Sequence, residues 1–486
     1  MRFRNPFSAR REPATPAPQD DFQSGMAHAR ALAEQGLAQE AALVLDGLLA
    51  RHGQDFDALY LLGNVCDEMA RTEQAHQAFT QALEIEPNHV GALCCAALDA
   101  RTLGRAAEAQ TLLEHAVRIA PESPHARFNR GLVRLDQKRD ADAAADFAAA
   151  RALARGHPWG IGNPVPTGAP AGIDLQSTDW QCARFKLTHD IEQMEYLRRL
   201  GKLHREFDAV LDEYRRALED PGLPLEPYQR APLDPGRYPL LAATWKRPVH
   251  APDPDPPAGG MVSANLPWTE IEAHYLAADP NLAWIDGLLT AQGLAALRGW
   301  CLESTVWNDL KAGYLGAYMH DGFASRLMLQ LVAELRQRMP RVIGDLPLQT
   351  MWAYKYDSQQ AGIGLHADEA AVNVNFWITP DGANLDSSRG GLVVHTRDAP
   401  DGWGFRRFNS EPEEIRHYLQ SEGGAAVRVP YRENRAVFFD SDLFHETDHF
   451  HFKSGYENRR INITWLFGSR GRSDARISRA DSQPAS

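Results

Sequence analysis

Residues 72–87 read TEQAHQAFTQALEIEP, and residues 106–121, which lie 34 positions later, read AAEAQTLLEHAVRIAP. Small residues, one large apolar residue and a closing proline fall at the same places in both stretches. The columns continue into a third copy: Ala75, Ala109 and Ala143; Phe79, Leu113 and Phe147; Ala82, Ala116 and Ala150. Within each copy these residues are spaced by three or four positions, which is the period of one helix face. The sequence therefore predicts helices that repeat every 34 residues and pack closely through small side chains.

A period of 34 with these columns resembles the tetratricopeptide repeat, which is a pair of packed helices. An earlier unit in the same register keeps Ala29, Ala41 and Leu45 but departs at Leu48, where the later copies have Ala. Terminal repeats of such arrays often diverge because they cap the stack. We therefore expect an all-α tetratricopeptide-repeat solenoid over residues 23–155.

Two roles for this solenoid stay open. It could serve dimerisation or hold the rest of the chain in place, or its groove could capture a protein or peptide partner. No column of Asn, Lys or Arg recurs at a groove-facing place, which a site for a peptide carboxylate would favour.

Charge and composition exclude several classes of protein. The formal net charge of -13 over 486 residues leaves no broad excess of Lys and Arg, so a nucleic-acid partner is not expected. The five Cys lack metal-ligand spacing and predict a reducing compartment without a disulfide framework. No apolar stretch reaches the roughly 18 residues that span a bilayer. We expect a cytoplasmic protein with no membrane partner.

Composition also divides the rest of the chain. Residues 1–22 lack the apolar core of a signal peptide and are expected to form a disordered arm. Residues 156–275 are rich in Pro and Gly and are expected to form a linker that contains one helix, from about His189 to Leu218. Residues 471–486 are expected to form a disordered tail.

The segment 276–470 changes from helical to alternating periodicity. Val372, Val374, Phe376 and Ile378 alternate with a second set that contains Asn375, so one face of this strand is apolar and the other is partly polar. That second set is Asn373, Asn375, Trp377 and Thr379. Many short strands with Gly, Asp and Asn between them predict a jelly-roll with flanking helices. The polar face is then expected to line an interior pocket.

The most informative motif of this segment combines two histidines and one aspartate. His366 and Asp368 are two apart and would point the same way from a strand end. His445 follows a short turn after an apolar strand, and it is preferred over His449 and His451 for that reason. Two imidazoles and one carboxylate can occupy one face of an octahedral Fe(II) ion and leave three positions open. The sequence predicts a metal site from His366, Asp368 and His445.

Residues 284–468 resemble the Fe(II)/2-oxoglutarate-dependent oxygenase superfamily, in particular its prolyl-hydroxylase-like members. The resemblance implies a double-stranded β-helix with His366, Asp368 and His445 as the catalytic metal ligands. It also implies that Tyr356, ten positions before His366, contacts 2-oxoglutarate, with Tyr354 as the second choice.

The resemblance further assigns the arginine of the co-substrate site. In some members it stands six residues before a strand Trp, which selects Arg459 over Arg460 by its distance from Trp465. Asn375 would hydrogen-bond 2-oxoglutarate or orient a metal ligand.

The activity implied is hydroxylation of a protein, a peptide or a small molecule, with Fe(II), 2-oxoglutarate and O2. His366 and His445 stand 79 positions apart, with an inserted loop over about 399–424, and this leaves the substrate class open. Two alternatives stay open: a tetratricopeptide-repeat interaction protein whose β-helix domain is catalytically inactive, and a cupin-type metalloenzyme without 2-oxoglutarate, which would not need Arg459.

Overall fold

The computed structural model describes residues 18–157, 159, 173–358, 362–400 and 402–470. Residues 1–17 of the predicted arm and the predicted tail lie outside this range, whereas residues 18–22 belong to the first helix. The chain divides into two compact units, residues 1–119 and 120–486. Among the described residues, no helix is both long enough and apolar enough to cross a membrane.

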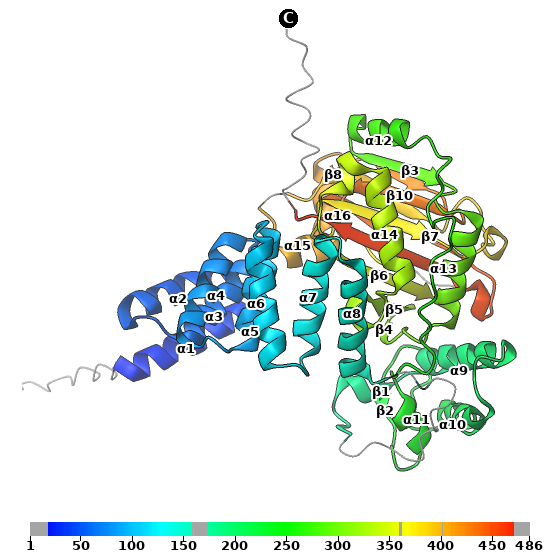
Figure 1. The fold of residues 1–486 in the computed structure, drawn as a ribbon, viewed down its shortest axis with the longest axis horizontal. Coiled ribbons are helices and arrows are strands. Elements are labelled where there is room, and N and C mark those ends of the chain that lie inside the picture. The colour runs from blue at the N-terminus through cyan, green and yellow to red at the C-terminus, as the bar shows by residue number, and fades with distance from the viewer. Residues whose placement is uncertain (1–17, 158, 160–172, 359–361, 401, 471–486) are drawn as a thin grey trace, which may run out of the picture. The chain divides into compact units, whose positions relative to one another are not determined.

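The first unit is built from six helices in successive pairs (Figure 1). They are α1 (Pro18–Glu34), α2 (Ala38–His52), α3 (Phe56–Glu68), α4 (Thr72–Ile85), α5 (Val90–Thr102) and α6 (Ala106–Ile119). The predicted columns form its core, because Ala75, Phe79, Ala82 and Leu113 are fully buried. The predicted all-α repeat region is therefore present.

Size complementarity across each helix pair explains one variable column. A Cβ atom on Gly63 would lie 2.5 Å from the Phe79 ring, and one on Gly131 would lie 2.6 Å from the Phe147 ring. The middle copy has Ala97 in this column, and there the facing residue is the smaller Leu113. Glycine therefore stands where the facing ring needs the space.

This packing predicts that Gly63→Ala destabilises the repeats. The added methyl group must displace the buried Phe79 ring, so we expect the free energy of unfolding to fall by about 1–3 kcal/mol. Thermal melting with circular dichroism would measure it. Adding Phe79→Leu should restore part of the loss, and a Gly63→Ala protein that melts like the parent would contradict this packing.

A buried carboxyl group interrupts the core of α5. Asp99 stands in a column where the neighbouring copies have Val65 and Val133, and it is only 5% exposed. Burial first, and then the nearby Asp67 carboxyl, raise the pKa of Asp99 from 3.8 to about 9. Burial also raises the pKa of Asp67. The two side chains are hydrogen-bonded, so the folded unit holds a proton there at neutral pH.

The raised pKa of Asp99 predicts a pH-dependent stability. Between its unfolded and folded pKa values the unfolded chain has lost the proton that the folded chain keeps, so the free energy of unfolding falls as pH rises from about 4 to about 9. Asp99→Asn removes this titration. We expect a flatter profile of melting temperature against pH and a higher melting temperature than the parent at pH 8. Parallel profiles would contradict the assignment.

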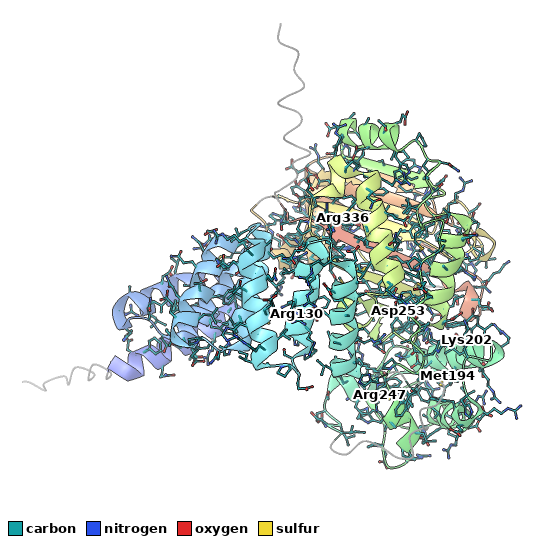
Figure 2. All side chains as sticks on the ribbon, viewed as in Figure 1. Arg130, Met194, Lys202, Arg247, Asp253 and Arg336 are labelled. Carbon is teal, nitrogen blue, oxygen red and sulfur yellow. The ribbon has the colours of Figure 1, made fainter. Side chains whose placement is uncertain are left out.

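The second unit begins with α7 (Pro124–Asp136) and α8 (Asp140–Arg155), which continue the 34-residue pattern. Arg130 of α7 donates to the buried Asp146 of α8 through two bonds of 2.8 and 2.7 Å. Arg336 of α14 (Arg326–Arg338) lies 3.9 Å from Asp136 (Figure 2). Arg155 donates to Asp321 at 2.6 Å. The helices α7 and α8 therefore belong to the same compact unit as the two sheets.

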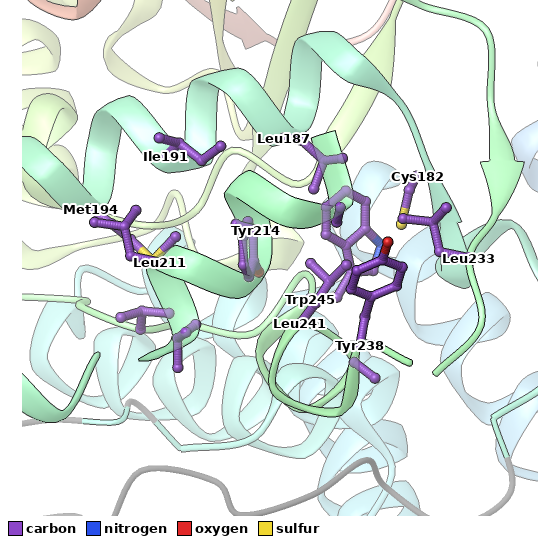
Figure 3. Packing of buried hydrophobic residues seen from close by; sticks show 14 of the residues in the cluster. Cys182, Leu187, Ile191, Met194, Leu211, Tyr214, Leu233, Tyr238, Leu241 and Trp245 are labelled. Carbon is purple, nitrogen blue, oxygen red and sulfur yellow. The ribbon is translucent and has the colours of Figure 1, made fainter. Parts of the chain in front are cut away.

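Residues 178–249 form a packed helical segment and not the predicted linker (Figure 3). The predicted single helix is two helices, α9 (Arg184–Arg199) and α10 (Asp208–Leu218), followed by the short α11 (Pro239–Thr244). Their apolar stripes share one core with side chains of the Pro-rich turns. That core includes Leu187, Met194, Leu211, Tyr214, Tyr238 and Trp245. Proline interrupts helices and strands but does not prevent a segment from being buried. The Pro and Gly content therefore led to the wrong prediction of a linker.

Ten strands make up two antiparallel sheets of the second unit (Figure 1). The seven-stranded sheet has the order β3-β10-β7-β12-β6-β5-β4, and the three-stranded sheet has the order β11-β8-β9. The strands are β3 (Leu282–Asp286), β4 (Asp309–Lys311), β5 (Tyr314–Tyr318), β6 (Leu348–Tyr356), β7 (Val372–Trp377), β8 (Leu392–Asp398), β9 (Ala426–Val429), β10 (Arg435–Asp440), β11 (Leu443–Thr447) and β12 (Ile461–Phe467). A short two-stranded ladder, β1 (Gln181–Cys182) with β2 (Ala231–Pro232), lies in the helical segment.

Four further helices accompany the sheets: α12 (Trp268–Ala277), α13 (Ala291–Glu303), α15 (Phe405–Ser410) and α16 (Pro412–Ser421). The last two lie within the predicted inserted loop. The predicted antiparallel, strand-rich segment is thus present with its flanking helices.

One core lies between the two sheets. Trp377 and Phe439 of the large sheet share a cluster with Val394 and Leu443 of the small sheet. The partly polar face of β7 therefore looks toward the small sheet, as the sequence predicts for an interior pocket. Any ligand held by that face would be enclosed between two layers.

Candidate metal centre

Strand pairing brings the three predicted metal ligands together. His366 and His445 exchange two backbone hydrogen bonds of 3.0 and 2.7 Å, and their ring centroids are 4.3 Å apart. Asp368 Oδ1 lies 3.7 Å from His366 Nε2, and its Oδ2 lies 3.5 Å from His445 Nε2. One ligand atom from each residue lies within 4.8 Å of the other two. The spacing lets a single cation contact all three side chains.

The other histidines of this stretch do not join the group. His449 and His451 are both exposed, whereas His445 is 3% exposed. His445 also packs against the Phe439 ring at 4.8 Å, which fixes its orientation.

Backbone carbonyls orient both imidazoles. His366 Nδ1 lies 2.7 Å from the Gly364 carbonyl oxygen, and His445 Nδ1 lies 3.0 Å from the Leu443 carbonyl oxygen. A carbonyl can only accept, so each Nδ1 carries the proton that it donates. Burial, and then the neighbouring His445, lower the pKa of His366 to about 4. The Nε2 lone pair of His366 is therefore directed at the carboxylate, an arrangement that a shared cation would stabilise.

Asp368 stays ionised in this buried position. Burial raises its pKa, but the two neighbouring imidazoles and the hydrogen bond of Asn373 lower it further, and the net shift is downward. Asn373 Nδ2 donates to Asp368 Oδ2 at 2.6 Å. Two imidazoles and one carboxylate form the donor set that suits Fe(II).

Arg459, the arginine predicted for the co-substrate, is not brought to this site. Its guanidinium donates to Glu192 of α9 at 3.0 and 2.9 Å and to Asp357 at 3.3 Å, and it lies over the Phe185 ring. Arg459 and Arg460 are consecutive residues directly before β12, and the hydrogen bond from the Tyr356 N–H to the Arg460 carbonyl extends the pairing of β12 to Arg460. Side chains alternate along a strand, and a shift of one residue moves a side chain to the opposite face.

Arg460 occupies the interior face instead. It is 1% exposed, and its guanidinium carbon lies 4.7 Å from the centre of the Tyr356 ring. Its Nε donates to the Gly390 carbonyl at 2.8 Å, and its Nη2 donates to the Gly391 carbonyl at 3.4 Å. Its Nη1 is buried and has no hydrogen-bond partner in the part of the chain that the structure describes. Among the described residues, Arg460 forms no ion pair with a carboxylate.

A buried guanidinium with a spare donor is costly unless an anion accepts from it. Burial lowers the pKa of Arg460, which reflects this cost. Further buried donors without a partner lie on the same face, namely the indole nitrogens of Trp352 and Trp377. Together these groups form a region suited to a carboxylate.

The two other predicted co-substrate residues lie on the interior face. Tyr356 is fully buried beside Arg460, and burial raises the pKa of its hydroxyl, so it stays a hydrogen-bond donor. Asn375 accepts from Asn462 at 2.9 Å and donates to Asn373 at 2.7 Å. Tyr354, the second choice, lies with its hydroxyl 3.4 Å from that of Tyr318.

Four polar residues of this region were not predicted as site residues: Asn373, Arg460, Asn462 and Thr464. Three of them could have been found from the alternation of β12, because positions 460, 462 and 464 share one face. Asn373 was already placed with Asn375 on the face expected to line a pocket, but only Asn375 was predicted as a site residue.

Comparison with known proteins identifies the repeats. Residues 56–89 and residues 96–158 match family models described as tetratricopeptide repeat. This confirms the predicted repeats at these residues. Neither match extends into the segment that carries the two sheets. No curated protein matches the sequence significantly.

Solved structures similar to this chain include proteins described as tetratricopeptide-repeat proteins. MamA from Desulfovibrio magneticus RS-1 is 22% identical, with a TM-score of 0.26, over 28% of this chain and 76% of that one. TTC0263 of Thermus thermophilus, a thermophilic repeat protein, is 21% identical, with a TM-score of 0.25, over 27% of this chain and 74% of that one. YrrB, described as a repeat protein with an unusual peptide-binding site, is 19% identical, with a TM-score of 0.26, over 28% of this chain and 74% of that one. Likenesses at such TM-scores carry no functional conclusion.

Proposed function

We propose that this tetratricopeptide-repeat protein is an Fe(II)- and 2-oxoglutarate-dependent oxygenase, and that its two antiparallel sheets form a double-stranded β-helix. The observation that carries the proposal is the convergence of His366, Asp368 and His445, whose ligand atoms lie within 4.8 Å of one another. The buried, unpaired Nη1 of Arg460 supports it independently, since a metal site alone would not need that group.

The residues fit the metal and the co-substrate. His366 and His445 each direct Nε2 inward because Nδ1 donates to a backbone carbonyl, and Asp368 adds one negative charge. Bound Fe(II), with 2-oxoglutarate and O2, supplies oxidative decarboxylation of the co-substrate coupled to hydroxylation of a second substrate. Arg460 and Tyr356 would hold the far carboxylate of 2-oxoglutarate through charge-assisted hydrogen bonds. Arg460 replaces Arg459 in this role.

The surrounding side chains shield Arg460 from water. Tyr356, Trp377 and Phe439 are fully buried on the interior face. In such surroundings, electrostatic contacts to a carboxylate are stronger than in water. The protein's part is thus to orient ligands, to hold the co-substrate and to keep solvent away.

The repeats give a proposed role in binding a protein or peptide, as partner or substrate. A second candidate function follows from them: a repeat-based interaction protein whose sheet domain is catalytically inactive. The family matches favour it, because they cover residues 56–89 and 96–158 and no part of the sheets. The intact triad and the buried Arg460 favour the oxygenase.

Anaerobic titration separates the two functions. The full-length protein is loaded with Fe(II) and then 2-oxoglutarate, and the visible charge-transfer absorption of the chelate is followed. The oxygenase proposal expects saturable absorption at one Fe(II) per chain. If calorimetry finds neither Fe(II) nor Co(II) uptake by folded protein, the interaction function stands alone.

A further inference from the structure

A continuous chain of side-chain amides crosses the interior face of the large sheet and ends at Asp368. Asn373 Nδ2 donates to Asp368 Oδ2 at 2.6 Å, and Asn375 Nδ2 donates to Asn373 Oδ1 at 2.7 Å. Asn462 Nδ2, on the neighbouring strand β12, donates to Asn375 Oδ1 at 2.9 Å. The three asparagines are 0%, 5% and 5% exposed. Water therefore competes little for these bonds.

One ionised group fixes the direction of every bond in this chain. A carboxylate can only accept, so Asn373 must turn its NH2 group toward Asp368. The carbonyl oxygen of Asn373 then needs a donor, which is the NH2 group of Asn375, and the same reasoning orients Asn462. The amide dipoles are thus aligned, and each bond strengthens the next.

At the far end of the row of amides, no group sets the direction of the hydrogen bonds, so Asp368 alone sets it. Asn462 Oδ1 is buried and has no hydrogen-bond partner among the described residues, so no donor imposes the order from that side. Thr464 Oγ1 lies 3.3 Å from Asn375 Oδ1 and 3.1 Å from Asn462 Nδ2, where its hydroxyl can serve both amides.

We infer that Asn373, Asn375 and Asn462 are positioning residues that hold Asp368 as a ligand through one oxygen; this rests on the proposed metal site. The bond from Asn373 uses one lone pair of Oδ2, which also lies 3.5 Å from His445 Nε2, and it leaves Oδ1, 3.7 Å from His366 Nε2, without a donor from the amides, so Oδ1 is the oxygen assigned to the ion. A carboxylate free to rotate could bind through both oxygens and take a position needed by the co-substrate. The amide chain keeps that position open.

The test measures Co(II) affinity of the full-length protein by calorimetry, together with the visible absorption of bound Co(II) and the melting temperature. Asn373→Leu should weaken Co(II) binding 10- to 100-fold, as loss of a group that orients a metal ligand does. It should also alter the Co(II) spectrum, because Asp368 can then rotate. Asn281→Leu is the matched control. Asn281 is also a buried asparagine, but it donates to the Tyr275 carbonyl and is not hydrogen-bonded to the row of amides that ends at Asp368.

Asn375→Leu distinguishes a chain from a single hydrogen bond. Asn375 makes no hydrogen bond to a metal ligand, so a merely structural role predicts unchanged Co(II) affinity. The amide chain predicts weaker binding, and it predicts that the double variant with Asn373→Leu is no weaker than Asn373→Leu alone. If Asn373→Leu does not fold, Asn375→Leu carries the test.

Each outcome is decisive. Parent-like affinity and spectrum in folded Asn373→Leu or Asn375→Leu, with only a lower melting temperature, overturn the inference. Equal losses of affinity in the Asn281→Leu control also overturn it. A parent protein that binds no Co(II) refutes the proposed metal site itself, which is a different failure from unchanged affinity in the variants.

Discussion

Arg460→Ala is expected to weaken 2-oxoglutarate binding to the Fe(II)-loaded protein about 100-fold, while Fe(II) affinity changes little. The guanidinium is 1% exposed and has a donor with no partner, so a carboxylate there gains charge-assisted hydrogen bonds away from water. Loss of one such contact costs roughly 2–5 kcal/mol, and 2.7 kcal/mol corresponds to about 100-fold. The dissociation constant can be read anaerobically from the charge-transfer absorption.

Arg459→Ala is the matched control, one residue away on the opposite face of the strand. It removes the ion pairs with Glu192 and Asp357, so it should lower the melting temperature and leave the dissociation constant of 2-oxoglutarate near that of the parent. If Arg459→Ala weakened 2-oxoglutarate binding and Arg460→Ala did not, Arg459 would be the co-substrate arginine, as its distance from Trp465 predicts.

His366→Ala is expected to abolish Fe(II) binding and, with it, release of succinate from 2-oxoglutarate. Without His366, the ion would have only two protein ligands, His445 and Asp368, which is too few to hold it. Succinate can be quantified after incubation with Fe(II), 2-oxoglutarate and O2, and Fe(II) uptake can be measured anaerobically by calorimetry. A variant that released succinate at the parent rate would refute the metal assignment.

His449→Ala is the control for that experiment. His449 belongs to the same stretch as His445 but is exposed and outside the group of ligands. We expect parent-like Fe(II) uptake and succinate release. Loss of both in His449→Ala, with His445→Ala unaffected, would mean that the wrong histidine had been chosen.

The grouping of the three candidate ligands could be predicted because their spacing is local. His366 and Asp368 are two residues apart, so any strand end directs them to one side, and His445 is marked by the apolar strand before it. The repeats were predictable for a similar reason, since each copy repeats the same contacts. Both features are encoded by short-range spacing.

The arginine could not be chosen from spacing to Trp465 alone. Its face depends on how β12 pairs with its neighbours: Asn462 pairs with Tyr354, and the Tyr356 N–H donates to the Arg460 carbonyl. That pairing places Arg460 beside Tyr356. The helical segment around α9 was missed for another reason, because its core joins stripes that are far apart in sequence and separated by Pro-rich turns.

The ion pair between Arg155 and Asp321 has a practical consequence for dividing this chain. A fragment starting at residue 156, after the last repeat, would lack α8 and with it the Arg155 cation that pairs with Asp321, whereas Asn308 would still donate to that carboxylate. Removal of one partner of such an ion pair is destabilising. An expression fragment of the unit that carries the sheets should therefore begin near residue 120 and retain the final pair of helices, even though sequence similarity groups that pair with the repeats before it.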